Sequence, residues 1–200
     1  KASVCVSSGK TIDGSLVKIV NDRREKVGVN RIGEIAVKSV SMFDGYRNYP
    51  EKTLEVTDSK GWFYTGDLGF LNEDELFVIG RIKDIIIVGG ENIYPEDIED
   101  AINNVENVIP GRVVAFGEEN ENLGTEQISV VAETKLDNEI QLLKLSKDII
   151  EAGIRIDTNI SSVYLVTPRW LIKSSSGKPS RKTNKQRIID NIDKNVWSNK

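Results

Sequence analysis

The chain has 200 residues, a formal net charge of −4, no histidine and a single cysteine. The lack of histidine excludes Ser-His-Asp and Cys-His catalysis and histidine-ligated zinc, and the lone Cys5 excludes an internal disulfide and cysteine-pair metal sites. We therefore expect no metal site, an inert thiol and a cytoplasmic location, while the negative charge disfavours general nucleic-acid binding.

The first 60 residues read as short strands separated by turns. Residues 15–20 alternate loosely between apolar and polar side chains, and residues 33–38 alternate well, with Ile35 and Val37 on one face. This spacing predicts a small antiparallel β-rich, barrel-like subdomain rather than β-α-β units. We expect it to serve as a scaffold without chemistry of its own.

A hairpin is predicted next. An aromatic run at residues 62–64 precedes a predicted turn at residues 65–67, and a second turn precedes a strand over residues 75–79 that ends at Gly80. A charged break at Lys83 and Asp84 separates this strand from the aliphatic run that follows. We therefore predict two domains, residues 1–82 and residues 83–200.

The second half mixes helices and strands and predicts a compact, mobile α+β lobe. Pro95, followed by two acidic residues, is typical of a helix start, and Asp137 is expected to cap a helix that reaches about Ala152. Strands are predicted at residues 112–116 and 127–132, a last strand at residues 162–167, and a charged helix at about residues 182–195. The fold class is therefore α+β.

Four features are candidates for chemistry, each with a plain alternative. Residues 174–178 are not a P-loop, because Ile172 stands where a P-loop has its first glycine, and Pro179 replaces the magnesium-binding hydroxyl residue. Backbone donors and the ammonium of Lys178 could still bind an oxyanion, or the segment could be a solvated surface loop. The segment from residue 169 to the end contains nine basic and only two acidic residues, so this loop lies in a strongly basic part of the sequence.

Asp67, Arg81 and the Gly89-Gly90 pair are the other candidates. The carboxylate of Asp67 could accept hydrogen bonds from a vicinal diol such as ribose, or cap its own turn. The Arg81 guanidinium could meet a ribose or phosphate oxygen, or form a surface ion pair with Glu75 or Asp84. The two glycines could form a simple turn or let the backbone pass close to a ligand.

Successive motifs along nearly the whole chain resemble those of the adenylate-forming superfamily, which contains acyl-CoA synthetases, fatty acyl-AMP ligases, peptide-synthetase adenylation domains and luciferases. The motifs stand in the family's order: Gly33-Glu-Ile, Gly45-Tyr46, Pro50-Glu-Lys-Thr53, Tyr64-Thr-Gly-Asp67, Gly80-Arg81, Gly90-Glu-Asn-Ile-Tyr-Pro95 with Glu99, and Ser176-Gly-Lys178. The amino-acid sequences at residues 66–70 and 80–84 are most similar to those of fatty acyl-AMP ligases and acyl-CoA synthetases.

The resemblance implies a two-step reaction in which ATP activates a carboxylic acid, expected to be a fatty acid, as acyl-AMP. The thiol of CoA or of the phosphopantetheine arm of an acyl carrier protein then takes the acyl group. It also implies ATP and Mg²⁺ as cofactors, with the Mg²⁺ held mainly by a domain upstream of Lys1 that carries the phosphate-binding loop. This chain would then be the C-terminal portion of a ligase, and alone we expect it to be inactive.

The resemblance also implies roles for single residues. Lys178 matches the catalytic lysine of adenylation, while Asp67 and Arg81 match the residues that bind the ATP or AMP ribose and phosphate. Lys83 matches the hinge, and Gly89 and Gly90 match the loop that lines the pantetheine tunnel.

The chain departs from the family pattern at Ile172, where a proline is usual, and at Pro179, where an aliphatic residue is usual. A peptide-synthetase adenylation domain and a non-catalytic interaction module that retains the fold remain alternatives.

Overall fold

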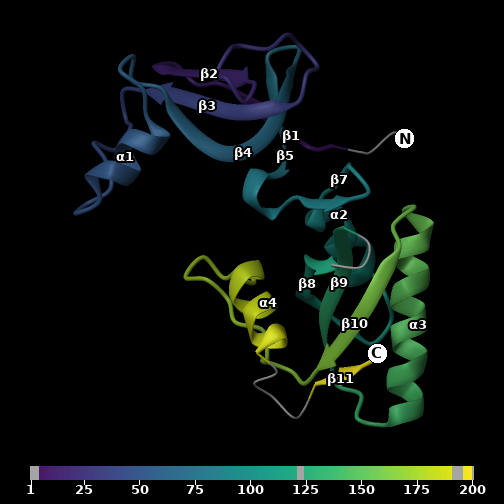
Figure 1. Cartoon of the computed structure of the whole chain (residues 1–200). Helices are drawn as coiled ribbons and strands as arrows, with labels where there is room; N and C mark the ends of the chain where they lie inside the picture. The colour runs from purple at the N-terminus through teal and green to yellow at the C-terminus, as the bar shows by residue number, and fades with distance from the viewer. Residues whose placement is uncertain (1–4, 121–123, 191–195, 200) are drawn as a thin grey trace. The chain divides into compact units, whose positions relative to one another are not determined.

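The structure is a computed structural model that describes residues 5–120, 124–190 and 196–199 (Figure 1). The chain divides into two compact units, Lys1–Lys83 and Asp84–Lys200, which we call the first and the second unit. The boundary after Lys83 falls one residue later than the boundary after residue 82 that the sequence predicts. Both units contain strands and helices, so the α+β class is confirmed.

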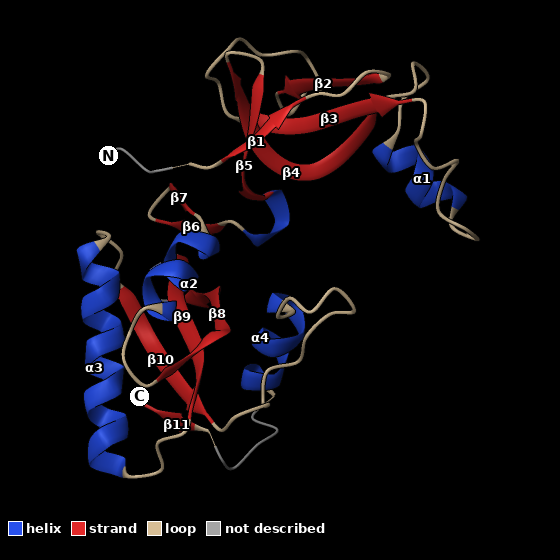
Figure 2. Cartoon of the chain, turned by 180° about the vertical axis from the view of Figure 1, so that it is seen from behind, coloured by secondary structure: helices blue, strands red, loops and turns tan. Residues whose placement is uncertain are grey.

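The first unit is built on a five-stranded antiparallel sheet in the order β1-β5-β4-β3-β2. Its elements are β1 (Ser7–Lys10), β2 (Ser15–Val20), β3 (Gly33–Ser39), α1 (Pro50–Val56), β4 (Phe63–Asn72) and β5 (Glu75–Arg81). With β1 and β2 at its two edges it is a curved sheet rather than a closed barrel (Figure 2). The short helix α1 was not predicted, although Pro50 stands in its first turn.

The turn predicted at residues 65–67 is wrong, because β4 continues through it. Gly66 has φ = +73°, and the β3–β4 register shifts between Glu34 and Ala36, so the segment is a bulge inside a strand. The Gly66 amide donates to Glu34 Oε1 at 2.9 Å, and the Thr65 hydroxyl donates to the Ile35 carbonyl at 2.9 Å. The bulge therefore keeps the strand paired while it redirects the next residue, Asp67.

The second unit is built on a four-stranded sheet in the order β11-β10-β9-β8. Its elements are η1 (Ile82–Asp84, which begins in the first unit), β6 (Ile86–Val88), β7 (Glu91–Ile93), α2 (Pro95–Asn103), β8 (Val108–Asn120), β9 (Thr125–Thr134), α3 (Glu139–Arg155), β10 (Ile160–Val166), α4 (Arg181–Ile189) and β11 (Trp197–Ser198). Strands β9 and β10 are parallel, joined through α3, and the other pairs are antiparallel.

Two sequence predictions for this unit need correction. The strand at β10 is not the last, since β11 pairs with it near the C-terminus. The final helix ends at Ile189, with Asp190 as its C-cap, and the predicted continuation over residues 191–195 lies outside the described part of the chain. Along residues 5–120, 124–190 and 196–199, no helix has the length and apolar character needed to span a membrane.

The sheet of the second unit is covered on both faces. Val113 and Ala115 of β8 belong to an apolar cluster that includes Ile98 of α2 and Ile149 of α3. The neighbouring residues point the other way, because strand side chains alternate. They form a second cluster, packed against the segment before the lysine loop and against α4: Val114, Phe116, Val131, Tyr164, Val166, Trp170 and Leu171, with Ile188 and Val196 at its margin. The segment that carries Lys178 is thus tied to a well-packed sheet.

The α3 N-cap is Asn138, not Asp137 as predicted: its Oδ1 accepts from the amides of Ile140 and Gln141 at 3.0 and 3.3 Å. We expect Asn138→Ala to lower the free energy of unfolding by about 1 kcal/mol, because two helix amides lose their acceptor. Asp137→Ala is the matched control and should change stability much less. Urea unfolding of both variants tests this, and an equal loss in the two would contradict the assigned cap.

Candidate active site

Asp67 and Arg81 form a cross-strand pair at the end of the β4–β5 ladder. The register places the two residues opposite each other, and Arg81 Nε donates to Asp67 Oδ1 at 2.8 Å. Their side chains are 33% and 49% exposed. The sequence left open a pairing of Arg81 with Glu75 or Asp84, whereas the structure pairs it with Asp67, and Asp84 pairs elsewhere.

The Asp67–Arg81 pair has the chemistry needed for a ribose or phosphate. A carboxylate accepts hydrogen bonds from vicinal hydroxyls, and a guanidinium donates in a planar fork to oxygen atoms. The bulge at Gly66 and the end of β5 place these two groups together at a solvent-accessible edge. Since exposed ion pairs contribute little stability, the pair adds little to holding the sheet together.

Lys83 stands at the division between the two units. It lies in the 3₁₀ turn η1 and is exposed, and the unit boundary follows it directly. A short turn between two separately packed units is where the backbone can change direction without disrupting a core.

Gly89 and Gly90 form the two-residue turn of the β6–β7 hairpin. Their φ angles are +59° and +87°, a left-handed conformation that other residues rarely adopt, and an added Cβ would meet no atom within 4 Å at either position. The turn therefore requires glycine for conformation and leaves its outer face open. The Gly89 amide donates to Thr125 Oγ1 at 2.8 Å, and the Ile87 amide donates to Glu126 Oε2 at 2.7 Å, so β9 holds the hairpin in place.

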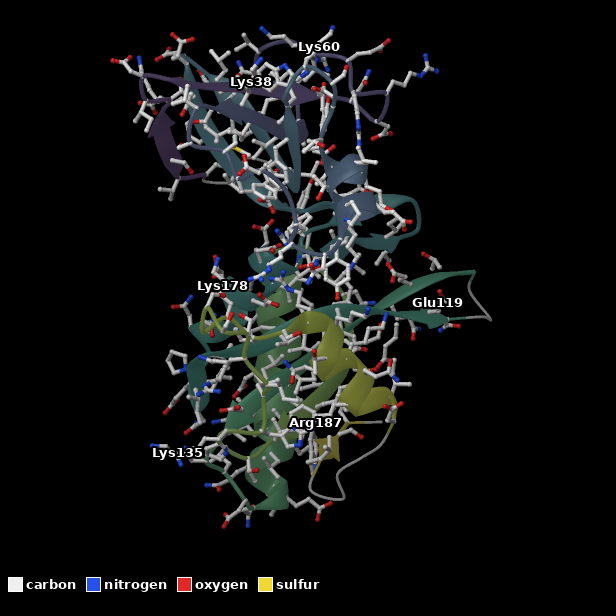
Figure 3. All side chains as sticks on the ribbon, turned by 90° about the vertical axis from the view of Figure 1, so that its left-hand side faces the viewer. Lys38, Lys60, Glu119, Lys135, Lys178 and Arg187 are labelled. Atoms are coloured by element: carbon white, nitrogen blue, oxygen red, sulfur yellow. The ribbon has the colours of Figure 1, made fainter. Side chains whose placement is uncertain are left out.

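Lys178 lies on a tight loop at the surface of the second unit (Figure 3). The Ser174 amide donates to the Lys178 carbonyl at 2.8 Å, and the Gly177 amide donates back to the Ser174 carbonyl at 2.9 Å. Lys173 and Pro179 close the base as an antiparallel bridge. The backbone of the loop is therefore ordered by its own hydrogen bonds, while the lysine side chain is exposed.

Asn184 fastens the base of this loop. Its side chain is fully buried; Oδ1 accepts from the Ile172 amide at 2.9 Å, and Nδ2 donates to the carbonyls of Ile172 and Ser180 at 2.9 and 2.8 Å. Ser180 in turn caps α4 through a bond from the Thr183 amide. Sequence reasoning missed Asn184, because a polar residue in a charged helix carries no signal of burial.

A second buried group, Glu133 of β9, holds the segment before the loop. Its side chain is 1% exposed and accepts from the amides of Arg169 and Leu171 at 2.9 and 2.8 Å, with Arg112 Nη1 at 3.6 Å. Glu133 lies in β9, one residue beyond the strand predicted at residues 127–132, so no sequence pattern selected it. Together with Asn184 it fixes both approaches to the Lys178 loop.

The proposed residues fall into two groups. Asp67 and Arg81 meet within the first unit, and the loop with Lys178 and the Gly89-Gly90 hairpin both belong to the second unit. Over the described residues, no group of three or more acidic, cysteine or histidine side chains is arranged to hold a metal ion.

The known proteins similar to this chain include CoA ligases and adenylate-forming enzymes. No protein-family model matches it. The 2-succinylbenzoate–CoA ligase of Listeria monocytogenes is 35% identical over 182 residues, which cover 90% of this chain and 35% of that protein. The solved structure of McyG A-PCP complexed with phenylalanyl-adenylate matches 94% of this chain and 34% of its own, with a TM-score of 0.86 and 28% identity. A structure of fatty acyl-adenylate ligases from E. coli and L. pneumophila matches 95% of this chain and 34% of its own. Its TM-score is 0.82, and the sequence identity is 28%.

The chain spans about a third of the length of these relatives. Sequence similarity over most of the chain and a shared fold agree with the order of motifs found in the sequence. The chain is similar over most of its length to adenylate-forming enzymes, and it has the fold of their C-terminal domain.

Proposed function

We propose that the chain is the C-terminal part of an ATP-dependent ligase that activates a carboxylic acid. In the first step a carboxylate oxygen attacks the α-phosphorus of ATP, the bond to the β-phosphate breaks, and pyrophosphate leaves. In the second step a pantetheine thiol loses its proton and attacks the acyl carbon, so that AMP leaves and a thioester forms. The acceptor thiol belongs to CoA or to a carrier protein, and a fatty acid is the proposed substrate.

The observation that carries this proposal is the exposed Lys178 beside the fixed base of its loop. Adenylation brings two anions together, the carboxylate and the α-phosphate. An ammonium between them relieves the repulsion and stabilises the charge that develops in the transition state. Lysine suits this task because it is a compact charge on a flexible stem, and the ordered backbone beneath it sets where that stem begins.

The Asp67–Arg81 pair would bind the nucleotide in the same reaction. Asp67 has the acceptor oxygens for the two ribose hydroxyls, and Arg81 beside it has donors for ribose or phosphate oxygens. Mg²⁺ would screen the triphosphate and be held mainly by residues upstream of this chain. In this scheme the first unit holds the nucleotide, and the second unit supplies the cation.

A rotation at Lys83 would let one centre perform both steps. One orientation of the second unit would deliver Lys178 for adenylation, and another would deliver the Gly89-Gly90 turn to line the path of the pantetheine arm. The open outer face of that turn supports the second role, because no side chain of its own would obstruct the arm.

Lys83→Pro tests this rotation in the full-length protein. Proline restricts φ at the proposed hinge, so we expect transfer of the acyl group to the thiol to fall about tenfold more than adenylation, or about 1.4 kcal/mol in barrier. The two half-reactions are measured separately, by ATP–pyrophosphate exchange and by thiolation of preformed acyl-AMP. Lys83→Ala, which leaves the backbone free, should lower neither selectively; equal losses in the proline variant would count against a rotating unit.

An adenylation domain of the peptide-synthetase type is the second candidate, favoured by the similarity to McyG A-PCP bound to phenylalanyl-adenylate. Acid-dependent ATP–pyrophosphate exchange with fatty, aryl and amino acids distinguishes the two. We expect exchange with fatty or aryl acids and thioester formation on CoA or an acyl carrier protein. Exchange with amino acids alone would favour the second candidate, and no acid-dependent exchange with any of them would overturn the proposal.

A further inference from the structure

Arg181 lies three residues after Lys178, at the first position of α4, and its guanidinium binds three carboxylates. Arg181 Nε and Nη2 donate to the two oxygens of Glu99 at 2.8 and 2.6 Å, a bidentate contact. Nη1 donates to Glu96 Oε1 at 2.8 Å and to Asp84 Oδ2 at 2.9 Å. The Arg181 side chain is only 18% exposed.

The three carboxylates come from separate parts of the second unit. Asp84 is the first residue after the proposed hinge, whereas Glu96 and Glu99 lie on the first two turns of α2. Glu99 Oε1 also accepts from the amide of Ala115 in β8 at 3.0 Å. One guanidinium thus ties the start of α4 to the hinge-side segment, to α2 and to the central sheet.

Electrostatics make this cluster sensitive to the loss of Arg181. Burial raises the pKa of the Glu99 carboxyl, and the bonds from Arg181 offset this only in part. Burial alone would lower the pKa of Arg181, but the bonds and charges of Glu99, Glu96 and Asp84 outweigh it and raise that pKa. Arginine suits the position because its planar fork has five donors, whereas a lysine ammonium cannot bind one carboxylate bidentately and also reach two others.

The chain between Arg181 and Lys178 has little freedom to absorb a displacement. Pro179 has a fixed φ, and the Ser180 amide donates to the Ile172 carbonyl at 2.9 Å. A shift of Arg181 would therefore move the base of the loop and the lysine with it.

We propose that Arg181 is a positioning residue for Lys178: it fixes the lysine loop relative to Asp84, beside the hinge, so that rotation delivers the ammonium to the reacting atoms in one defined place. This inference rests on the proposed function. The mechanism is indirect, since Arg181 acts through the loop and is not assigned a contact with substrate.

The first test is Arg181→Lys in the full-length protein, which keeps the charge and loses the fork. A misplacement of about 1 Å can cost about 10²-fold in rate, so we expect acid-dependent ATP–pyrophosphate exchange to fall by that order. Thiolation of supplied acyl-AMP should stay within the range of the control Arg155→Met, which removes an arginine that pairs with Glu151 on the exposed face of α3. Exchange at the control level, or parallel losses in both half-reactions, would overturn the inference.

A second pair of variants guards against a purely structural effect. Glu96 and Asp84 both accept from Arg181 Nη1, but only Asp84 connects it to the hinge side. We expect Asp84→Asn to lower exchange more than Glu96→Gln does, with similar melting temperatures for the two. If the loss of exchange simply follows the melting temperature across these variants, Arg181 is a stability residue and the inference fails.

Lys178→Ala separates a failure of this inference from a failure of the proposed function. If Lys178→Ala retains exchange, the proposed function fails. If Lys178→Ala loses exchange while Arg181→Lys keeps it, only the positioning role fails. In the Lys178→Ala background, Arg181→Lys should have no further effect on exchange, because both changes remove the same interaction; an additive loss would overturn the positioning role.

Discussion

Lys178→Ala in the full-length protein should lower acid-dependent ATP–pyrophosphate exchange by about 10²–10³-fold, while thiolation of preformed acyl-AMP is largely retained. The asymmetry follows from the charges. The adenylation step brings two anions together and needs a cation between them, whereas the attack of a thiol on acyl-AMP occurs after that repulsion has been relieved. The two half-reactions measured on one preparation give the ratio directly.

Lys173→Ala is the matched control for this prediction. Lys173 is exposed in the same loop, and its bridge to Pro179 involves only the backbone. We expect Lys173→Ala to keep exchange close to the wild-type level. A similar loss in both variants would mean that the basic surface acts as a whole, and exchange that survives in Lys178→Ala would exclude the assigned role.

Glu133→Ala has the largest expected effect on stability. The carboxylate is buried and accepts from the amides of Arg169 and Leu171, with Arg112 nearby. Its removal leaves two amides without their acceptor and a partly buried guanidinium without its counter-charge, so we expect the free energy of unfolding to fall by about 3 kcal/mol. Guanidinium chloride unfolding measures this loss.

Two further variants make the Glu133 prediction specific. Glu133→Gln keeps one carbonyl oxygen and should cost less than the alanine change, because one of the two amides retains an acceptor. Glu106→Ala, at an exposed position before β8, should be close to neutral. A Glu133→Ala protein as stable as Glu106→Ala would contradict the account of how the approach to the lysine loop is held.

Elements with strong local signals could be predicted from the sequence. Pro95 with its following acidic residues begins α2 as expected, and the apolar runs of β8 and β9 are strands. Errors arose where a local signal has two outcomes. Gly66 supplies a positive φ in a turn and in a bulge alike, and only the neighbouring strand decides between them. Asp137 and Asn138 are both good helix caps, and the structure uses the second, whose side chain accepts from two amides of the first turn.

The residues of the candidate site also differ in whether a local sequence signal reveals them. Motifs that stand in one order along the chain predict roles for Lys178, Asp67 and Arg81. The residues that hold the lysine loop could not be identified in this way, because their partners are distant in sequence: Arg181 lies 82 residues from Glu99 and 97 from Asp84. Such contacts exist only after the second unit has packed, so periodicity and capping rules carry no information about them.

A crystal structure of the full-length protein with a non-hydrolysable acyl-adenylate analogue would show directly whether Lys178 reaches the reacting atoms. We expect Lys178 Nζ within about 3.5 Å of an oxygen at the acyl–phosphate junction, with Asp67 on the ribose hydroxyls. An analogue bound by Asp67, with Lys178 directed into solvent and another cation at the junction, would contradict this role of Lys178.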